Sequence, residues 1–400
     1  MADATAPGTA SLPRPSEVSP AGPSRPAPLA AETPLPNRVG RYAQPETTDG
    51  APDDERILAA IDIGTNSIHM VVVRIEPDLP SFRIIDTQKD TVRLGNFSPN
   101  TQALREDAID RAIAALKRCL QIAHSLEADD IVAVATSATR EAANGQDFID
   151  RVRAEVGLAV NVISGPEEAR RIYLGVISGM ELQVKPHAII DIGGGSTELI
   201  LGAGAQPQFL SSTKVGAVRL NAQMITTNPV SETEFIRLGA YVRGRLEPAV
   251  DDLKAALQPG DSLQMIGTSG TIETLAALSA AEELGSVPDP LNGYVLTLAQ
   301  VEAWADRLRR MSYCQRVELS ELSPRRAEII VPGAVVLLEA MRMLGVERLV
   351  ICERALREGL VVDWMLNHGL IEDRMHYQKS VRHRSVVKTA HKYRVDMAHS

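Results

Sequence analysis

The sequence predicts an α/β fold built from two similar halves, and two observations lead to this prediction. The stretch at residues 61–72, I-D-I-G-T-N-S-I-H-M-V-V, is repeated in outline at residues 188–202, A-I-I-D-I-G-G-G-S-T-E-L-I-L-G. Around both copies, short apolar runs alternate with longer segments in which apolar residues recur at helical spacing. Internal self-similarity is a signal at the level of the fold. With 400 residues, 44% of them hydrophobic, the chain is long enough for one lobe per copy.

The second copy predicts a β-hairpin with a Gly-rich turn, because two apolar runs flank three consecutive glycines. A turn centred between Gly194 and Gly195 places Asp191 opposite Glu198. Like charges at facing positions destabilise a hairpin, so we expect this pair to hold a cation, and oxygen ligands suit Mg2+. The alternative is an ordinary tight hairpin whose two acids face water.

The glycines also predict an anion site, because backbone N–H groups without a neighbouring Cβ can converge on phosphate oxygens. In the first copy Asp62, Gly64 and Ser67 occupy the matching positions. His69 stands where the second copy has Glu198, so only one copy carries the acid pair, and we expect His69 to pack or bond locally. Two such turns, one per half, predict two lobes that close on a chain of phosphates.

Composition excludes some classes of protein and indicates the cellular compartment. The formal net charge of -9 gives no general attraction to polyanions and argues against a nucleic-acid binder. A phosphate-rich ligand must then be held by local cations and backbone donors. The three cysteines lie far apart in apolar surroundings, and neither a secretory signal nor a membrane-spanning run is visible. We therefore expect a cytoplasmic protein with reduced thiols and no membrane partner. The histidines show no zinc-binding spacing.

The first lobe is expected at residues 55–180. It follows a segment, residues 1–54, that holds 11 of the 24 prolines and predicts a disordered extension, with a docking tail as the alternative. The pattern predicts strands at 57–63, 68–75, 82–85, 130–135 and 160–163, and helices at 103–126, 148–156 and from Pro166 onward. Arg140 lies just beyond the fourth strand, where α/β sheets usually place ligands.

Pro166 predicts a helix start, and two acids follow it, Glu167 and Glu168. Acids at this position complement the positive end of a helix, so a structural role explains both. Neighbouring helical residues point in different directions, so at most one of the two faces a given cleft. The spacing alone does not choose between them.

The second lobe is expected at residues 181–368. After the hairpin, the pattern predicts strands at 207–212, 262–266 and 348–352, and helices at 232–256, 297–310, 323–343 and 353–366. The G-T-S-G turn that follows the second of these strands opens a helix. It is either a further anion site formed by Gly267, Ser269 and Gly270, or a plain connection.

Six motifs occur in an order that resembles one known family. They are D-I-G-T-N-S, A-T-S-A-T-R-E-A-A-N, S-G-P-E-E-A-R, D-I-G-G-G-S-T-E-L, G-T-S-G-T and A-L-R-E-G. From about Ile57 onward the chain resembles the exopolyphosphatase/guanosine pentaphosphate phosphohydrolase (Ppx/GppA) family, of the actin-like, sugar-kinase and heat-shock ATPase superfamily. The resemblance implies two ribonuclease-H-like lobes, each a mixed sheet flanked by helices, with the active site in the cleft between them.

The resemblance also implies roles for individual residues. Glu168 matches the proposed catalytic base, and Arg140 matches the arginine that binds the terminal phosphates. Asp191 and Glu198 match the acids associated with Mg2+, which agrees with the cross-strand argument. The implied phosphate-binding residues are Gly64, Thr65, Asn66, Ser67, Gly193, Gly194, Gly195 and Ser196.

The implied activity is hydrolysis of the terminal phosphoanhydride bond of inorganic polyphosphate, with Mg2+ and release of orthophosphate. The sequence does not decide whether the reaction also requires a monovalent cation. The nearest alternative is removal of the 5′ γ-phosphate from guanosine pentaphosphate (pppGpp), which uses the same catalytic groups. More distant alternatives are an actin-like ATP-binding regulatory protein and a polyphosphate sensor without catalysis. Members of the family are often dimers, so a homodimer is the family-level expectation.

The last residues depart from the family pattern. Residues 369–400 are basic, and R-H-R-S-V-V-K-T-A-H-K-Y-R-V-D at 382–396 resembles the first helix of the HD-like domain that extends longer members. We expect the start of a missing or truncated domain here, either in a truncated chain or as the vestigial tail of a short form. Its positive charges form either a solvated face or a track for a polyanion.

Overall fold

The computed structural model describes residues 55–76, 81–98, 101–180, 182, 185–203 and 206–371. The predicted Pro-rich extension at 1–54 lies outside these residues, and so does the predicted basic tail from residue 372 onward. The described residues form two mixed sheets with helices packed against them, which confirms the predicted α/β class.

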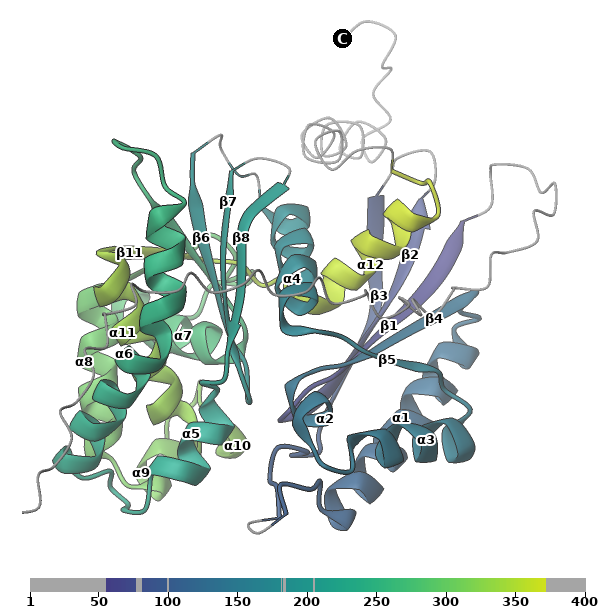
Figure 1. The fold of residues 1–400 in the computed structure, drawn as a ribbon, viewed down its shortest axis with the longest axis horizontal. Helices are drawn as coiled ribbons and strands as arrows, with labels where there is room; N and C mark the ends of the chain where they lie inside the picture. The colour runs from purple at the N-terminus through teal and green to yellow at the C-terminus, as the bar shows by residue number, and fades with distance from the viewer. Residues whose placement is uncertain are drawn as a thin grey trace, which may run out of the picture. The chain divides into compact units, whose positions relative to one another are not determined.

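The first sheet has the strand order β3-β2-β1-β4-β5 (Figure 1). Its antiparallel part consists of β1 (Arg56–Ile63), β2 (Ser67–Glu76) and β3 (Ser81–Thr91). Two strands run parallel to β1 and to each other, β4 (Asp130–Ala135) and β5 (Val160–Val162). The centre of β1 is apolar and buried on both faces, as expected for a strand covered by helices on both sides. The chain between these strands forms helices α1 (Glu106–Ser125), α2 (Ser137–Glu141) and α3 (Gly145–Val156).

The second sheet has the order β10-β11-β9-β6-β7-β8. Its strands are β6 (His187–Ile192), β7 (Thr197–Ala203), β8 (Gln206–Thr213), β9 (Gln264–Thr268), β10 (Val295–Thr297) and β11 (Arg348–Ile351). The β6–β7 register pairs Asp191 with Glu198, and the β1–β2 register pairs Asp62 with His69. Both facing pairs are those that the sequence alignment predicted.

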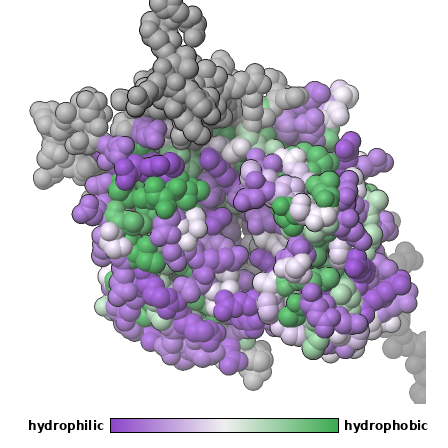
Figure 2. All heavy atoms as spheres, turned by 180° about the vertical axis from the view of Figure 1, so that it is seen from behind, coloured by the Kyte–Doolittle hydropathy of each residue, from purple (hydrophilic) through white to green (hydrophobic). Residues whose placement is uncertain are grey.

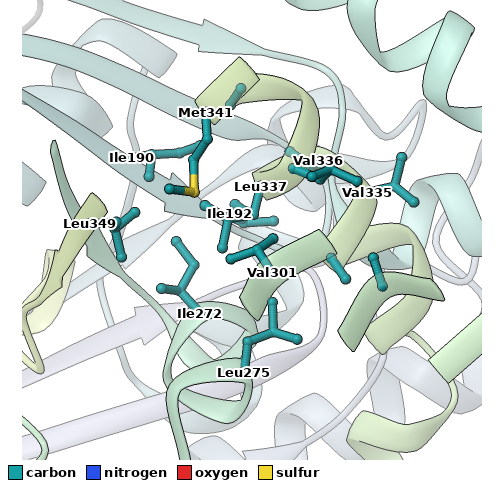
Figure 3. Close-up of a cluster of buried hydrophobic side chains, with 14 of the residues drawn as sticks. Ile190, Ile192, Ile272, Leu275, Val301, Val335, Val336, Leu337, Met341 and Leu349 are labelled. Atoms are coloured by element: carbon teal, nitrogen blue, oxygen red, sulfur yellow. The ribbon is translucent and has the colours of Figure 1, made fainter. Parts of the chain in front are cut away.

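The helices of the second half build its core. They are α5 (Ala217–Met224), α6 (Glu232–Ala255), α7 (Gly270–Leu284), α8 (Leu298–Arg310), α9 (Tyr313–Val317), α10 (Pro324–Ala327), α11 (Ile330–Leu344) and α12 (Leu356–Asn367). Figure 3 shows Met341 and its neighbours on α11 packed against Ile190, Ile192 and Leu349 of the sheet. The sequence predicted one helix at 323–343. The structure breaks it before α11, which places Pro332 in a first helical turn, where a missing N–H does no harm.

Two helices pack against the sheet formed by the other half of the chain (Figure 1). Helix α4 (Gly165–Gly179) packs against β7 and β8, although it follows the first sheet in the chain. Helix α12 follows the second sheet, yet it packs against β1 and β2. The two helices also pack on each other, and one buried apolar cluster includes residues from both helices and both sheets.

Glycines permit the close crossing of α4 and α12. A Cβ added at Gly175 would lie 1.9 Å from the carbonyl oxygen of Ala355, and one at Gly359 would lie 1.8 Å from that of Arg171. A buried ion-pair network also joins the helices, because Asp363 accepts hydrogen bonds from Arg170 at 2.6 Å and from Arg171 at 3.2 Å. Backbone contact and charge together fix the position of α4, the helix that carries Glu168.

One face of the molecule is largely hydrophilic (Figure 2). Figure 2 shows one face of the molecule, on which hydrophilic residues predominate around smaller hydrophobic areas. Within the described part of the chain, no helix is both long enough and apolar enough to span a membrane.

Candidate functional site

A cavity of about 310 Å³ lies where the turns of the two similar hairpins meet. The same backbone hydrogen bond closes both turns, from Gly64 N to Ser67 O and from Gly193 N to Ser196 O, each at 3.0 Å. The turns pack directly on each other, because a Cβ added at Gly195 would lie 2.6 Å from Thr65 Oγ1. The backbone of both turns therefore faces one common space.

Arg219 of helix α5 holds the second turn in place and links it to the first half of the chain. The Arg219 Nε donates to Gly195 O at 2.8 Å, and its Nη2 donates to Glu141 Oε2 at 2.9 Å. Glu141 also accepts from Ser137 Oγ at 2.8 Å and pairs with Lys214 at 3.0 Å. Glu141 thus connects helix α2, at the end of strand β4, to the glycine turn of the other sheet.

Four carboxyl groups line the cavity, Asp62, Glu168, Asp191 and Glu198. Asp62 is half-buried and the other three are buried. Burial raises the pKa of Asp62 to about 7, and the charge of Glu168 adds to this effect. Burial and the neighbouring acids raise the pKa of Asp191 to about 8. Burial and the charge of Asp191 also raise the pKa of Glu198. Without a cation, the site therefore favours protonated carboxyl groups.

Glu168 is the acid that faces the cavity, and its neighbour Glu167 does not line it. The Glu168 side chain is 9% exposed, and its Oε2 accepts a hydrogen bond from Arg140 Nη1 at 3.1 Å. Burial and the charge of Glu198 raise the Glu168 pKa, against the opposing effect of Arg140. Glu167 instead binds Arg170 at 2.7 Å, on the side of the helix that faces α12. The structure thus separates the two acids that spacing alone did not.

Most of the predicted site residues line this one cavity. They are Gly64, Thr65, Asn66, Ser67, Glu168, Asp191, Gly193, Gly194, Gly195, Ser196, Glu198, Ser269 and Gly270.

Two predicted residues are not among the lining residues. Arg140 contacts Glu168 and donates to Ile163 O at 2.7 Å. Gly267 lies inside strand β9, where an added Cβ would meet Leu349 at 2.7 Å and Ile272 at 2.8 Å, both core side chains. Gly267 thus permits core packing, whereas Ser269 and Gly270 reach the cavity.

The sequence prediction missed several charged residues of the cavity, among them Asp62, Lys89, Glu273, Arg326 and Arg357. The alignment of the two hairpins could have identified Asp62, and the A-L-R-E-G motif contains Arg357. The other three have no local signal in the sequence. His69 also lines the cavity, and burial together with the nearby cations lowers its pKa well below the usual value.

The donor set fits a hard cation. The Asp62 Oδ1 atom is buried and has no hydrogen-bond partner among the described residues, and a bound cation would favour the charged form of all four acids. Among the residues that the structure describes, no group of three or more His, Cys, Asp or Glu side chains is arranged to hold a metal ion. A cation here would then use one or two carboxylates together with water or substrate oxygens, which is the usual coordination of Mg2+.

Comparison with known proteins identifies the family of the chain. Residues 71–368 match the Ppx/GppA phosphatase family. Exopolyphosphatase 1 of Mycobacterium leprae is 31% identical over 309 residues, which is 76% of this chain and 88% of that protein. Exopolyphosphatase 1 of Mycobacterium tuberculosis is 31% identical over 306 residues, or 76% of this chain and 87% of that protein.

Two crystal structures extend the comparison to the fold. That of an exopolyphosphatase from Cytophaga hutchinsonii superposes with a TM-score of 0.72 at 25% identity, over 78% of this chain and 98% of that one. That of the Aquifex aeolicus member of the Ppx/GppA family gives a TM-score of 0.66 at 29% identity, over 79% and 99% of the two chains. The resemblance inferred from the motifs is confirmed, and the chain belongs to the Ppx/GppA phosphatase family.

Proposed function

We propose that this protein is a Mg2+-dependent exopolyphosphatase that hydrolyses the terminal phosphoanhydride bond of inorganic polyphosphate and releases orthophosphate. Its family makes it a metal-dependent phosphohydrolase, and the names of its Mycobacterium relatives support polyphosphate as the substrate. We also propose that the metal ion is Mg2+ and that the protein is cytoplasmic.

The observation that carries the proposal is the position of Glu168. It is a buried carboxyl group with a raised pKa, it lines the same cavity as two glycine turns, and it contacts Arg140 at 3.1 Å. A carboxylate whose pKa is raised toward neutrality is suited to accept a proton from water at physiological pH. In this proposal Glu168 orients the attacking water and removes its proton.

The remaining residues position and neutralise the phosphates. Backbone N–H groups of the two turns would hold phosphate oxygens, and Arg140, beside Glu168, would bind the terminal phosphoryl group with its planar fork of donors. Mg2+ bound by Asp191 and Glu198 would neutralise charge on the phosphate oxygens. Catalysis of phosphoryl transfer consists mainly of such positioning and charge stabilisation.

The test is steady-state phosphate release in the presence of Mg2+ from long-chain polyphosphate, tripolyphosphate, pppGpp and ATP. We expect polyphosphate to be the preferred substrate. Glu168→Gln should lower kcat by about 10²–10⁴-fold, as is typical when a general base is lost, while polyphosphate still binds. Glu167→Gln is the matched control, because it changes the neighbouring acid that does not line the cavity.

The outcomes separate the alternatives. A preference for pppGpp would transfer the assignment to the guanosine substrate with the same catalytic groups. An equal loss of activity in the Glu167 and Glu168 variants would contradict the assignment of the base. Absence of hydrolysis of any of these compounds, with tight binding of ATP, would refute the proposal.

A further inference from the structure

A second cavity, of about 510 Å³, adjoins the first. The two share five lining residues, Asn66, Lys89, Gly270, Glu273 and Arg326. Because the same side chains border both spaces, a ligand that fills the first cavity can continue into the second past these residues. Strand β3, helix α7 and the segment around α10 supply most of the second cavity's lining.

The two cavities differ in charge. The first contains Glu168 and three further acids, Asp62, Asp191 and Glu198, whereas the cations Lys89, Arg325 and Arg326 outnumber the acids Glu273 and Glu321 in the lining of the second. None of these three cations forms a salt bridge within the described part of the chain, although Arg93 nearby in sequence pairs with Glu328 at 2.6 Å. The second cavity therefore presents positive charge that no carboxylate of the described residues neutralises by direct contact.

Arg326 lies at the junction of the cavities, over the N-terminus of α7. Its Nη2 is 2.2 Å from the position that a Cβ on Gly270, the first residue of that helix, would occupy. Ser269, which precedes Gly270, makes no side-chain capping bond to the helix. The only hydrogen bond of the Arg326 guanidinium among the described residues is to Thr271 Oγ1, at 3.4 Å. A guanidinium beside the positive end of a helix repels it, and an anion between them would reverse the sign of that interaction.

The lining of the second cavity favours a phosphate chain over a nucleoside. No aromatic ring is among its lining residues, and protein sites for nucleobases commonly stack the base on aromatic side chains. Hydroxyl, amide and cationic side chains line it instead. Such groups suit a linear polyanion whose internal units each carry the same charge.

We propose that the second cavity is a subsite for the phosphates of polyphosphate that lie beyond the hydrolysed end, held by Lys89, Arg325 and Arg326. This inference rests on the proposed function, since it extends the substrate of the same site. It makes these three cations specificity residues that favour long chains over short ones. A substrate that ends within the first cavity gains less from them.

The test measures how the enzyme discriminates between chain lengths. The variants Lys89→Gln and Arg325→Gln each remove one charge of the subsite, and Arg83→Gln, an exposed position on the same strand as Lys89, is the matched control. We expect each subsite variant to lower the ratio of kcat/KM for long-chain polyphosphate to that for tripolyphosphate by about tenfold or more, as for loss of a charge-assisted hydrogen bond. Arg325→Lys should restore part of the ratio, because it returns the charge without the planar fork.

Binding provides a second readout that does not need turnover. Calorimetric titration of long-chain polyphosphate in the presence of a chelator should give a weaker dissociation constant for both subsite variants than for wild type and Arg83→Gln. Hydrolysis with an unchanged length ratio would overturn the subsite and leave the proposed function intact. Absence of hydrolysis, with binding that still depends on Lys89 and Arg325, would support the subsite and overturn the function. Absence of both hydrolysis and binding would overturn both.

Discussion

Replacing Gly359 with alanine tests how closely helices α4 and α12 must approach. The added Cβ would lie 1.8 Å from the Arg171 carbonyl oxygen, whereas ordinary contact begins at 3.4 Å. The helices would have to separate by about 1.6 Å, the difference between these two distances. Because Arg171 lies one helical turn after Glu168, the separation would move the carboxylate of Glu168, the proposed base, as well.

The magnitude follows from two opposing effects. Overpacking of a close contact costs about 1–3 kcal/mol, and alanine gains about 1 kcal/mol over glycine in a helix. Gly244 supplies the control, since it lies in helix α6 with no atom within 4 Å of an added Cβ. Gly244→Ala should therefore be slightly stabilised, and Gly359→Ala should be less stable than Gly244→Ala by about 1–3 kcal/mol. Activity should fall further, because a misplacement of about 1 Å can cost about 100-fold in rate.

The assay combines thermal unfolding with phosphate release from polyphosphate. Near the melting temperature, each kcal/mol changes Tm by about 2–4 °C in domains of about 150–250 residues, so the difference between the two variants is measurable. If Gly359→Ala matches Gly244→Ala in both Tm and kcat, the helices do not require this contact and the reasoning is refuted.

Three further predictions follow from the site and its supports. In a chelator, the free energy of unfolding should fall as pH rises from about 4 to 8, because the raised pKa values of Asp62 and Asp191 make the folded state hold more protons than the unfolded state. Each group contributes up to about 1.4 kcal/mol per pH unit to the slope of the unfolding free energy against pH. Mg2+ should flatten this pH dependence in thermal melts. An identical slope with and without Mg2+ would contradict the cation site. Asp363→Asn should lower the free energy of unfolding, measured with denaturant, by about 3–5 kcal/mol, since it leaves the buried Arg171 without a charged partner in α12. A loss below about 1 kcal/mol would count against a stabilising role of this ion-pair network. Arg219→Lys should lower kcat/KM about tenfold or more with little change in Tm. Lysine lacks the planar fork with which Arg219 bonds both Gly195 O and Glu141. Unchanged kinetics would argue that Arg219 does not position the glycine turn.

The parts of the site that the sequence could predict are those encoded locally. The register that faces Asp191 with Glu198 follows from where the glycines lie between two apolar runs, and the structure has that register. The same alignment places Asp62 opposite His69. A turn and its two strands are specified within about fifteen residues by side-chain periodicity and glycine position, so tertiary contacts are not needed to predict them.

The parts that could not be predicted depend on contacts distant in sequence. Lys89 and Arg326 line one cavity, although strands β4 to β10 lie between them in the sequence. No periodicity marks either residue as part of a site. Gly267 shows the opposite error. The sequence predicted it in a Gly-rich turn, whereas the structure places it in a packed strand. Burial distinguishes Glu168 from Glu167 for the same reason, because the fold decides which side of α4 faces the cavity.

The exchange of helices between the sheets has a consequence for synthesis on the ribosome. The face of β1 and β2 that carries Leu58, Ala60 and Val71 is buried in a cluster that includes Leu360 of α12. A nascent chain that has completed the first sheet still lacks this cover until the segment around residue 360 has left the exit tunnel. During that interval an apolar strand surface stays open to chaperones or to other nascent chains. The long sequence separation of this contact also favours slow folding. The half of the protein that is made first therefore cannot complete its core until the segment around residue 360 is available.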